Sequence, residues 1–376
     1  MVKPGNEKEA IKTIPETWER KKLKDVAPLQ RGFDLPYSQM KSGVYPVVFS
    51  NGIGAYHSEY MIPGPGVITG RSGTIGKVHF VQQNYWPHNT SLWVTDFHGN
   101  YEKYVYYLFN RINWNALNSG SGVPTLNRND VHEIEVELPP LSEQISIATA
   151  LSDIDALIAN LEKLILKKKA IKQGAMQELL TGKRRLPGYE ISIWNEYRLE
   201  EICKLINGRA YAQHELLDAG KYQVLRLGNL FTNEHWYYSD LELPDKQYCV
   251  DGDLIYAWSA TFGPRIWRGE KSIFHYHIWK LELSDSISKE FLYHYLCYDV
   301  RTLMAELQGG TMAHLTKGTM EKRQFVIPPY EEQCAIAEIL SDMDVEITNC
   351  EEILLKYKRI KAGMMSELLT GRIRLM

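Results

Sequence analysis

The sequence predicts a mixed α/β (α+β) protein in which two globular domains are separated by two long helices, all built from one internal repeat. Three observations lead to this prediction. A long helical segment occurs twice at a fixed offset, and both copies carry coiled-coil spacing. The regions outside the two copies are rich in short β-prone runs bounded by turn residues.

The internal repeat runs from a Pro-Pro pair to a Thr-Gly pair. The first copy extends from Pro139-Pro140 to Thr181-Gly182, and the second, offset by 189 residues (139 to 328), extends from Pro328-Pro329 to Thr370-Gly371. No gap is needed, and more than half of the aligned positions are identical. Because solenoid proteins repeat every few tens of residues, this longer period indicates a duplicated unit of one domain and one connector.

Each copy of the repeat is expected to form one long helix. Pro-Pro ends the preceding strand, since proline cannot lie inside a helix. Ser142 or Glu143 then falls in the first turn, where acceptors and negative charge satisfy free backbone donors. The Thr-Gly pair is a typical helix end. At about 1.5 Å per residue, a helix over 142–181 would be about 60 Å long.

Both helices carry an apolar seam with alternating spacings of three and four residues, which is typical of a coiled coil. Because neither helix can bury its seam alone, we expect the two to pack antiparallel, with their domains at opposite ends. The alternative is that each helix packs on its own domain or on another subunit. The seam is assigned to Leu151, Ile154, Ile158, Leu161, Ile165, Leu340, Met343, Ile347, Cys350, Leu354 and Tyr357.

These helices divide the chain into a first domain over 1–138, a first helix over 139–182, a short linker with the second domain over 183–327, and a second helix over 328–376. The globular segments proper run from about Ile14 to Leu138 and from about Ile191 to Ile327. Each is expected to be a mixed α/β globule with short strands and one longer helix, and the helices are placed at Tyr101–Arg111 and Lys289–Leu307.

Charge and cysteine usage limit the possible functions. The formal net charge is −3, whereas a protein that holds DNA unaided usually has a basic surplus. DNA binding would therefore require focused cations or a partner that supplies phosphate contacts. The five cysteines are far apart and form no C-x-x-C pair, so we expect a reducing, cytoplasmic location and no metal site. No apolar run is long enough for a membrane span.

Several apparent catalytic motifs fail on inspection, so we expect no catalytic residue and no cofactor. Ile327-Pro328-Pro329-Tyr330 resembles the N-P-P-Y motif of adenine methyltransferases, but Ile replaces the polar residue that must bind the target amino group. The loop Gly70–Lys77 has the wrong glycine spacing for a phosphate loop, and Val78 stands where Ser or Thr must reach magnesium. Pro244-Asp245 lacks a downstream acidic-x-Lys partner. His275 and His277 are expected to be neighbours on one strand face rather than metal ligands.

The order of motifs resembles a known family. Twice, a variable domain is followed by a Gly-rich turn (Ser119–Gly122; Gln308–Gly310) and a Leu-centred segment (Pro124–Asn127; His314–Thr316). A strand, P-P-x-x-E-Q and a long helix ending in L-L-T-G come next. In this the chain is similar to the specificity (S) subunit of type I restriction-modification systems.

The resemblance implies two target recognition domains, each reading one half of a bipartite double-stranded DNA site. It implies that the conserved helices dock two modification subunits, and that restriction subunits join in the full complex. The chain itself would be non-catalytic, within an assembly that is an adenine-specific DNA methyltransferase and an ATP-dependent endonuclease. One departure from some relatives is the short connection over Lys183–Glu190, which leaves the spacer length open.

Specific DNA reading needs polar and cationic side chains on loops that enter the grooves. The loop Thr69–Lys77 is the strongest candidate, because its glycines are expected to give a flexible backbone that can approach DNA closely. The candidate DNA-binding residues are Arg31, Tyr56, Arg71, Ser72, Thr74, Lys77 and Asn89 in the first domain, and Arg209, Arg226, Asn229, Ser259, Arg265 and His277 in the second.

Other functions stay open on sequence grounds. The chain could be a structural adaptor whose duplicated domains bind proteins, which the lack of positive charge favours. It could be the DNA-binding subunit of a related methyltransferase or nuclease assembly. An enzyme is a third option, against which the failed catalytic motifs argue.

Overall fold

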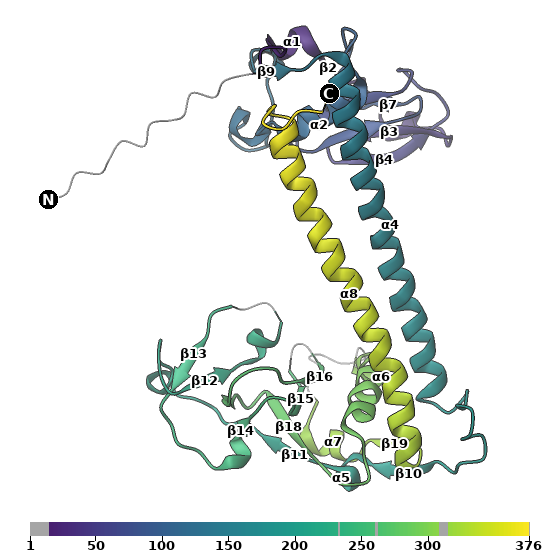
Figure 1. Ribbon diagram of the computed structural model, residues 1–376, viewed down its shortest axis with the longest axis vertical. Coiled ribbons are helices and arrows are strands. Elements are labelled where there is room, and N and C mark those ends of the chain that lie inside the picture. Colours follow the sequence, from purple (N-terminus) through teal and green to yellow (C-terminus); the bar gives the residue numbers. More distant parts are fainter. Residues whose placement is uncertain (1–14, 232–233, 260–261, 308–314, 376) are drawn as a thin grey trace, which may run out of the picture. The chain divides into compact units, whose positions relative to one another are not determined.

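The computed structural model describes residues 15–231, 234–259, 262–307 and 315–375. They form two compact units (Figure 1). Unit 1 combines the chain up to Glu162 with the chain from Glu352 onward, and unit 2 extends from Lys163 to Glu351. Each unit therefore contains one globular head and one half of each long helix. Ile14, part of the Ser259–Arg265 loop, the Gln308–Gly310 turn and His314 lie outside the described residues.

The head of unit 1 contains three antiparallel or mixed sheets, with strand orders β1-β9, β2-β8-β5-β6 and β4-β3-β7. Its first strand pairs with its last, so the two chain ends of the head meet where the long helix begins. The elements are β1 Glu19–Lys22, α1 Leu23–Val26, β2 Leu29–Arg31, η1 Tyr37–Gln39, β3 Tyr45–Phe49, β4 Gly52–His57, β5 Gly66–Gly70, β6 Val78–Val81, β7 Trp86–Pro87, β8 Ser91–Val94, α2 Glu102–Arg111, η2 Trp114–Leu117, α3 Arg128–His132 and β9 Glu135–Leu138.

The head of unit 2 repeats this plan, with strand orders β10-β19, β11-β18-β15-β16 and β13-β12-β17-β14. Strand β14 corresponds in unit 1 to a single antiparallel bridge between Ile62 and Tyr85, so the sheet there has three strands. The elements are β10 Asn195–Arg198, α5 Leu199–Ile202, β11 Cys203–Asn207, η3 Gln213–Glu215, β12 Tyr222–Leu225, η4 Leu227–Leu230, β13 Tyr237–Ser239, η5 Asp245–Gln247, β14 Tyr248–Cys249, β15 Leu254–Ala257, β16 Gly263–Ile266, β17 Ser272–Phe274, β18 Ile278–Leu283, α6 Lys289–Leu307, α7 Lys317–Glu321 and β19 Gln324–Ile327.

The two long helices are α4, Leu141–Leu179, and α8, Tyr330–Leu368. In unit 1, Ile147 and Leu151 of α4 share a buried core with Leu368 and Leu369 at the end of α8. In unit 2, Leu179 and Leu180 share a core with Ile336 and Leu340 near the start of α8. In each unit the beginning of one helix thus meets the end of the other, so the pairing is antiparallel, as the seam predicts.

Ion pairs across the two helices occur at the same repeat positions in both units. In unit 1, Lys361 Nζ lies 2.6 Å from Asp155 Oδ1 and Lys358 Nζ lies 2.7 Å from Glu162 Oε1. Their counterparts at the 189-residue offset in unit 2 are Lys172 with Asp344, and Lys169 Nζ with Glu351 Oε1 at 2.6 Å. The late lysines therefore neutralise carboxylates of the opposite helix.

The assigned seam side chains are all buried or partly covered along these helices. Leu151, Ile154, Ile165, Leu340 and Ile347 are buried. The other six, Ile158, Leu161, Met343, Cys350, Leu354 and Tyr357, are partly covered. The helices expected at Tyr101–Arg111 and Lys289–Leu307 appear within one residue of those bounds.

Both long helices end on a glycine that adopts the left-handed backbone conformation. Gly182 has φ +67° and Gly371 has φ +68°, which only glycine accommodates without strain. Carbons of the Trp194 ring lie 3.6 Å from a Cβ built on Gly182, and Pro15 Cγ would lie 2.6 Å from a Cβ on Gly371. The Thr-Gly helix ends expected from the sequence are therefore confirmed.

Candidate nucleic-acid interface

The Glu of the P-P-x-x-E-Q motif binds a Trp and an Arg in each unit, a group that we name the clasp. In unit 1, the Glu143 carboxylate accepts hydrogen bonds from Trp18 Nε1 at 3.0 Å and from Arg374 Nε and Nη2 at 2.6 and 2.7 Å. Burial alone would raise the pKa of Glu143, but the bonds from Arg374 and Trp18 outweigh it and hold the pKa below its ordinary value. Glu143 is therefore a buried, paired anion.

The clasp of unit 2 has the same three residue types: Glu332 and Arg185 are related to Glu143 and Arg374 by the 189-residue offset, and Trp194, like Trp18, lies just before the first strand of its head. Glu332 accepts from Trp194 Nε1 at 3.0 Å and from Arg185 Nε and Nη2 at 3.0 and 2.8 Å. Its side chain is fully buried. The sequence predicts only a backbone-capping role for Glu143 in the first turn. The larger role of both glutamates is to bind the residues that follow the other long helix, because Arg185 follows α4 and Arg374 follows α8.

The Gln of the motif connects each long helix, through hydrogen bonds, to the start of the helix in its own head. Gln144 Nε2 donates to the Pro139 carbonyl at 2.9 Å, and its Oε1 accepts from Tyr101 N, just before α2, at 3.0 Å. Gln333 repeats both bonds, with the Pro328 carbonyl at 2.9 Å and Ser288 N at 2.7 Å. The sequence signature thus describes a structural connection rather than a reacting group.

A second shared group, which we name the joint, connects the head helix to both long helices. In unit 1, Tyr107 Oη donates to Asp155 Oδ2 at 2.7 Å and lies 3.2 Å from Ser152 Oγ, while Lys361 pairs with the same Asp155. Burial raises the pKa of the Tyr107 hydroxyl, so this group is a neutral donor.

In unit 2, the joint consists of His294, Ser341, Asp344 and Lys172. His294 Nε2 lies 3.0 Å from Ser341 Oγ, and His294 Nδ1 lies 3.9 Å from Asp344 Oδ2. Burial lowers the pKa of His294 to about 4, and Lys172 lowers it further against the opposing effect of Asp344. His294 therefore takes the place of Tyr107 as a neutral imidazole.

Sequence reasoning missed the clasp and the joint, although a signal for both was present. The 189-residue offset continues past the terminal glycines to Arg185-Leu186 and Arg374-Leu375. It also relates Ser152 to Ser341 within the helices. Identity at non-seam positions was the available indication that these side chains have specific partners.

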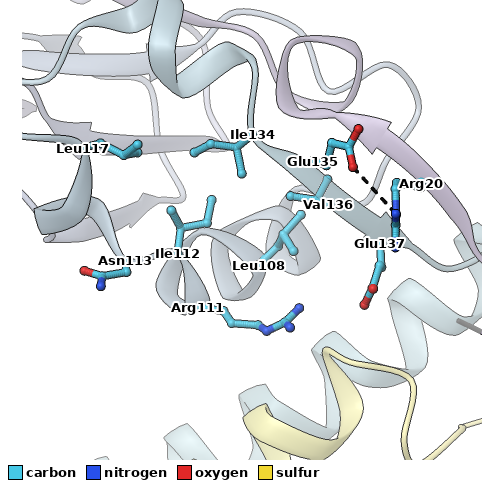
Figure 2. Close-up of a pocket in the computed structure, with 10 residues that line it drawn as sticks. All are labelled: Arg20, Leu108, Arg111, Ile112, Asn113, Leu117, Ile134, Glu135, Val136 and Glu137. Atoms are coloured by element: carbon cyan, nitrogen blue, oxygen red, sulfur yellow. Dashed lines mark ion pairs between the residues drawn. The ribbon is translucent and has the colours of Figure 1, made fainter. Parts of the chain in front are cut away.

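The heads differ where the helix packs on the last strand. In unit 1 a pocket of about 580 Å³ lies beside α2 and β9, with Leu108 and Val136 in its wall and Arg20, Arg111 and Glu135 among its polar lining (Figure 2). In unit 2 the positions of Leu108 and Val136 are held by Tyr295 and Phe325, whose ring centroids are 5.0 Å apart. Smaller side chains thus account for the hollow in unit 1.

The structure brings four of the unit 1 candidates together. Arg31 Nη2 lies 3.3 Å from Asp34 Oδ1, and Asn89 donates to the same carboxylate oxygen. The backbone N–H groups of Arg71 and Ser72 both donate to the Thr90 carbonyl, at 2.8 and 3.1 Å.

The glycine-containing loop Thr69–Lys77 has more backbone hydrogen bonds than a flexible loop would. Besides the two bonds to Thr90, Gly73 N donates to the Pro124 carbonyl at 3.0 Å and Leu126 N donates to the Arg71 carbonyl at 2.8 Å. The expectation of a flexible backbone is therefore not supported, because the loop is tied to two other segments. Thr74 is half-buried within it, and the Lys77 side chain is exposed. Tyr56 is 53% exposed on β4, in the other sheet.

In unit 2, three candidates surround the β17–β18 turn. Tyr276 N donates to the Arg209 carbonyl at 3.1 Å, His275 N donates to the Leu225 carbonyl next to Arg226, and the His277 ring lies 5.3 Å from that of Trp258. Arg209 also pairs with Glu215 at 2.7 Å. The His275 and His277 rings are 4.9 Å apart, but a turn rather than strand alternation brings them together, so that expectation was wrong.

The remaining candidates of unit 2 have local partners. Asn229 Oδ1 accepts from Arg226 N at 3.2 Å, and its amide donates to the His235 carbonyl. Arg265, on β16, lies over the ring of Phe231. Ser259 directly follows Trp258 in the chain. No group of three His, Cys, Asp or Glu side chains that could hold a metal ion occurs among the described residues. Within the same ranges, no helix is long and apolar enough to cross a membrane.

Comparison with known proteins identifies relatives of the whole arrangement. The family model "Type I restriction modification DNA specificity domain" matches residues 15–170 and again 191–357. The chain is 27% identical over 282 residues to the type I restriction enzyme MjaVIII specificity subunit of Methanocaldococcus jannaschii, covering 68% of this chain and 66% of that protein. It is 25% identical over 187 residues to the EcoBI specificity subunit of Escherichia coli, covering 48% of this chain and 39% of that protein.

A solved structure shares the fold. The crystal structure of the type I restriction-modification S subunit from M. genitalium superimposes with a TM-score of 0.67 at 17% identity, covering 98% of each chain. The two family matches together span well over half of the sequence and coincide with the two heads and their helices. The chain therefore belongs to the family of type I restriction modification DNA specificity domains, of which it carries two.

Proposed function

We propose that this chain is the DNA sequence-specificity subunit of a type I restriction-modification complex and that each head reads one half of a bipartite double-stranded site. One observation carries the proposal. The two heads share strand order and the clasp and joint positions, while their loop surfaces differ in chemistry. A duplicated scaffold with two different surfaces suits a protein that must read two different short sequences.

Partner proteins would supply much of the affinity for DNA. Phosphate neutralisation provides most non-specific DNA affinity, and a net charge of −3 offers little of it. In each unit the long helices expose large apolar side chains, which suit docking of partner proteins; examples are Leu157, Leu355 and Ile360 in unit 1, and Leu166, Ile171 and Val345 in unit 2. We assign these surfaces to two modification subunits, with restriction subunits joining the full complex.

The chain itself would be non-catalytic. The P-P-x-x-E-Q glutamate and glutamine are engaged in the clasp and in the connection to the head helix, which leaves them no role in bond chemistry. Methylation of adenine and ATP-dependent cleavage would then belong to the partner subunits.

Mobility-shift titration with and without the modification subunits tests this function. We expect weak binding by the chain alone and tight, sequence-specific binding by the assembled complex. Nanomolar binding at physiological salt by the chain alone would contradict the proposal that partner subunits supply much of the DNA affinity. An assembled complex that binds all duplexes equally would instead favour a protein-binding adaptor.

A further inference from the structure

The strand registers of the two heads define a corresponding corner in each. Arg31 at the end of β2 pairs with Leu92 of β8, and Asn207 at the end of β11 pairs with Trp279 of β18. Thr69 of β5 also pairs with Leu92, and Tyr256 of β15 pairs with Trp279. Two residues beyond these positions, Arg71 and Trp258 are therefore structural counterparts.

The turn that precedes β8 or β18 completes the corner. Arg71 N donates to the Thr90 carbonyl at 2.8 Å, and Trp258 N donates to the His277 carbonyl at 3.2 Å. A Cβ on Gly32 would lie 2.2 Å from the His88 carbonyl oxygen, and one on Gly208 would lie 2.4 Å from that of His275. In both heads only glycine allows this close approach of strand end and turn. The corner is thus Arg31, Arg71 and Asn89 in unit 1, and Asn207, Trp258 and Tyr276 in unit 2.

The corner of unit 1 has the chemistry of a guanine reader. The Arg71 side chain is half-buried, and its backbone is fixed by bonds to Thr90 and Leu126. Among the residues that the structure describes, Arg71 has no ion-pair partner, whereas Arg31 is held by Asp34. A guanidinium on a fixed backbone and without an ion-pair partner matches the O6 and N7 acceptors that guanine presents in the major groove.

The corner of unit 2 is a pocket with aromatic walls. About 470 Å³ of space is lined by Trp258, Tyr276, Trp279 and Leu315, and its polar lining is Asn207, Thr316 and Lys317. Trp258 stacks on Trp279 with ring centroids 5.6 Å apart and planes 16° apart, and its Nε1 donates to the Tyr276 carbonyl at 2.8 Å. These contacts hold the Trp258 ring in place, while Tyr276 is 40% exposed at the edge of the pocket.

The groups that the two corners share and those that differ suggest different tasks. A serine follows Arg71 in unit 1 and Trp258 in unit 2, as Ser72 and Ser259. A cation is the first residue of α3 and of α7, as Arg128 and Lys317. Contacts common to any DNA are made to phosphates, whereas sequence is read at base edges. The shared serine and cation suit phosphate, and the residues that differ suit bases.

We propose that the corner is the base-reading edge of each head: Arg71 contacts a guanine in the half-site of unit 1, and the Trp258–Tyr276 pocket receives the 5-methyl group of a thymine in the half-site of unit 2. This rests on the proposed function and names the residues that execute it. Apolar side chains recognise thymine through that methyl group, which no other DNA base carries in the major groove.

Base analogues in the assembled complex test the assignment. The site is first mapped from host DNA methylation, and exchange of one head shows which half belongs to unit 1. Duplexes then carry 7-deazaguanine at each guanine of that half, or deoxyuridine at each thymine of the other half. We expect one guanine position at which binding falls about tenfold. We also expect one thymine position at which loss of the methyl weakens binding about fourfold.

Variants assign each effect to its residue. Arg71→Ala removes the donors that would reach O6 and N7, so the 7-deazaguanine effect should disappear. Tyr276→Ala should abolish the deoxyuridine effect. Arg20→Ala and Arg268→Ala, exposed arginines on the same units, serve as controls and should leave both effects intact.

The outcomes separate this assignment from the function on which it rests. Analogue effects that persist in Arg71→Ala or Tyr276→Ala would overturn the assignment, as would a unit 1 half-site without guanine or a unit 2 half-site without thymine. Specific binding would survive either result, and the proposed function with it. A complex that does not distinguish its mapped site from unrelated duplex would refute the proposed function itself.

Discussion

The joint of unit 1 is built around Tyr107 and the joint of unit 2 around His294, while Ser, Asp and Lys occupy the other three positions in both. The phenol of Tyr107 reaches Asp155 directly at 2.7 Å, whereas His294 Nδ1 stays 3.9 Å from Asp344. The duplicated scaffold thus keeps the same partners but not the same sensitivity to protons. Only the unit 2 joint contains a group that can become charged under mildly acidic conditions.

The clasp should produce the largest change in stability, and it should do so equally in both units. Arg374→Ala leaves Glu143 charged and buried in unit 1, and Arg185→Ala does the same to Glu332 in unit 2. Removing one partner of a buried pair costs about 3–5 kcal/mol of unfolding free energy. Chemical denaturation measures the loss, and hydrogen exchange locates it in the unit concerned.

Exposed arginines beside each clasp provide the controls. Arg372→Ala and Arg184→Ala remove side chains that are 52% and 74% exposed, so each should cost about 1 kcal/mol or less. Clasp variants that behave like these controls would show that the clasp does not stabilise the unit in which it lies.

The joint predicts a pH dependence in unit 2 that follows from its histidine. The folded-state pKa of His294 is about 4, below the ordinary 6.5, so the unfolded chain binds the proton first. The stabilisation from neutral His294 is fully present above pH 6.5 and is lost as the pH falls towards 4. The shift corresponds to about 3 kcal/mol across that range.

Two reciprocal variants isolate this effect from other groups. His294→Gln should flatten the stability profile between pH 6.5 and 4 relative to the native chain, and Tyr107→His should steepen it by introducing a histidine into unit 1. Replacement of His98, which is about half exposed, is the matched control. Parallel profiles for the native chain and His294→Gln would contradict the buried, neutral histidine.

The helix ends should distinguish the units by a smaller amount. Alanine at Gly182 or Gly371 enters the left-handed conformation at a cost of about 1–2 kcal/mol. Gly371→Ala should cost more, because its Cβ would meet Pro15 at 2.6 Å whereas that of Gly182 meets Trp194 at 3.6 Å. Gly174→Ala has open space inside α4 and should instead stabilise. Thermal unfolding of the three variants gives the order, and a larger loss at Gly182 would contradict the contact with Pro15.

The architecture could be predicted from the sequence because the same helix signals occur in both copies of the repeat. The seam spacing, the Pro-Pro pairs and the Thr-Gly ends each set a helix boundary by local physics, and the structure has the helices where these signals lie. The clasp could not be predicted from local sequence patterns. Arg374 and Glu143 are 231 residues apart, and only the fold brings such distant side chains into contact.

The recognition surface was the least predictable part. Trp258 and Tyr276 carry no sequence signal that separates them from core aromatics, since their contact at the corner joins segments 18 residues apart. The Gly-rich loop was expected to be flexible from its composition, but its hydrogen bonds to Thr90 and Pro124 depend on segments that are distant in sequence. Which loop residues contact DNA therefore remains a prediction for every candidate.

Independent reading by the two heads is the central claim, and methylation mapping of a head exchange tests it most directly. Residues 15–138 are replaced by the corresponding domain of another family member that retains the tryptophan of the clasp, so that Glu143 and Arg374 keep their partner. We expect one half of the methylated sequence to change and the other half to stay as it was. Change in both halves at once would contradict it, because it would mean that the two heads read DNA as one surface.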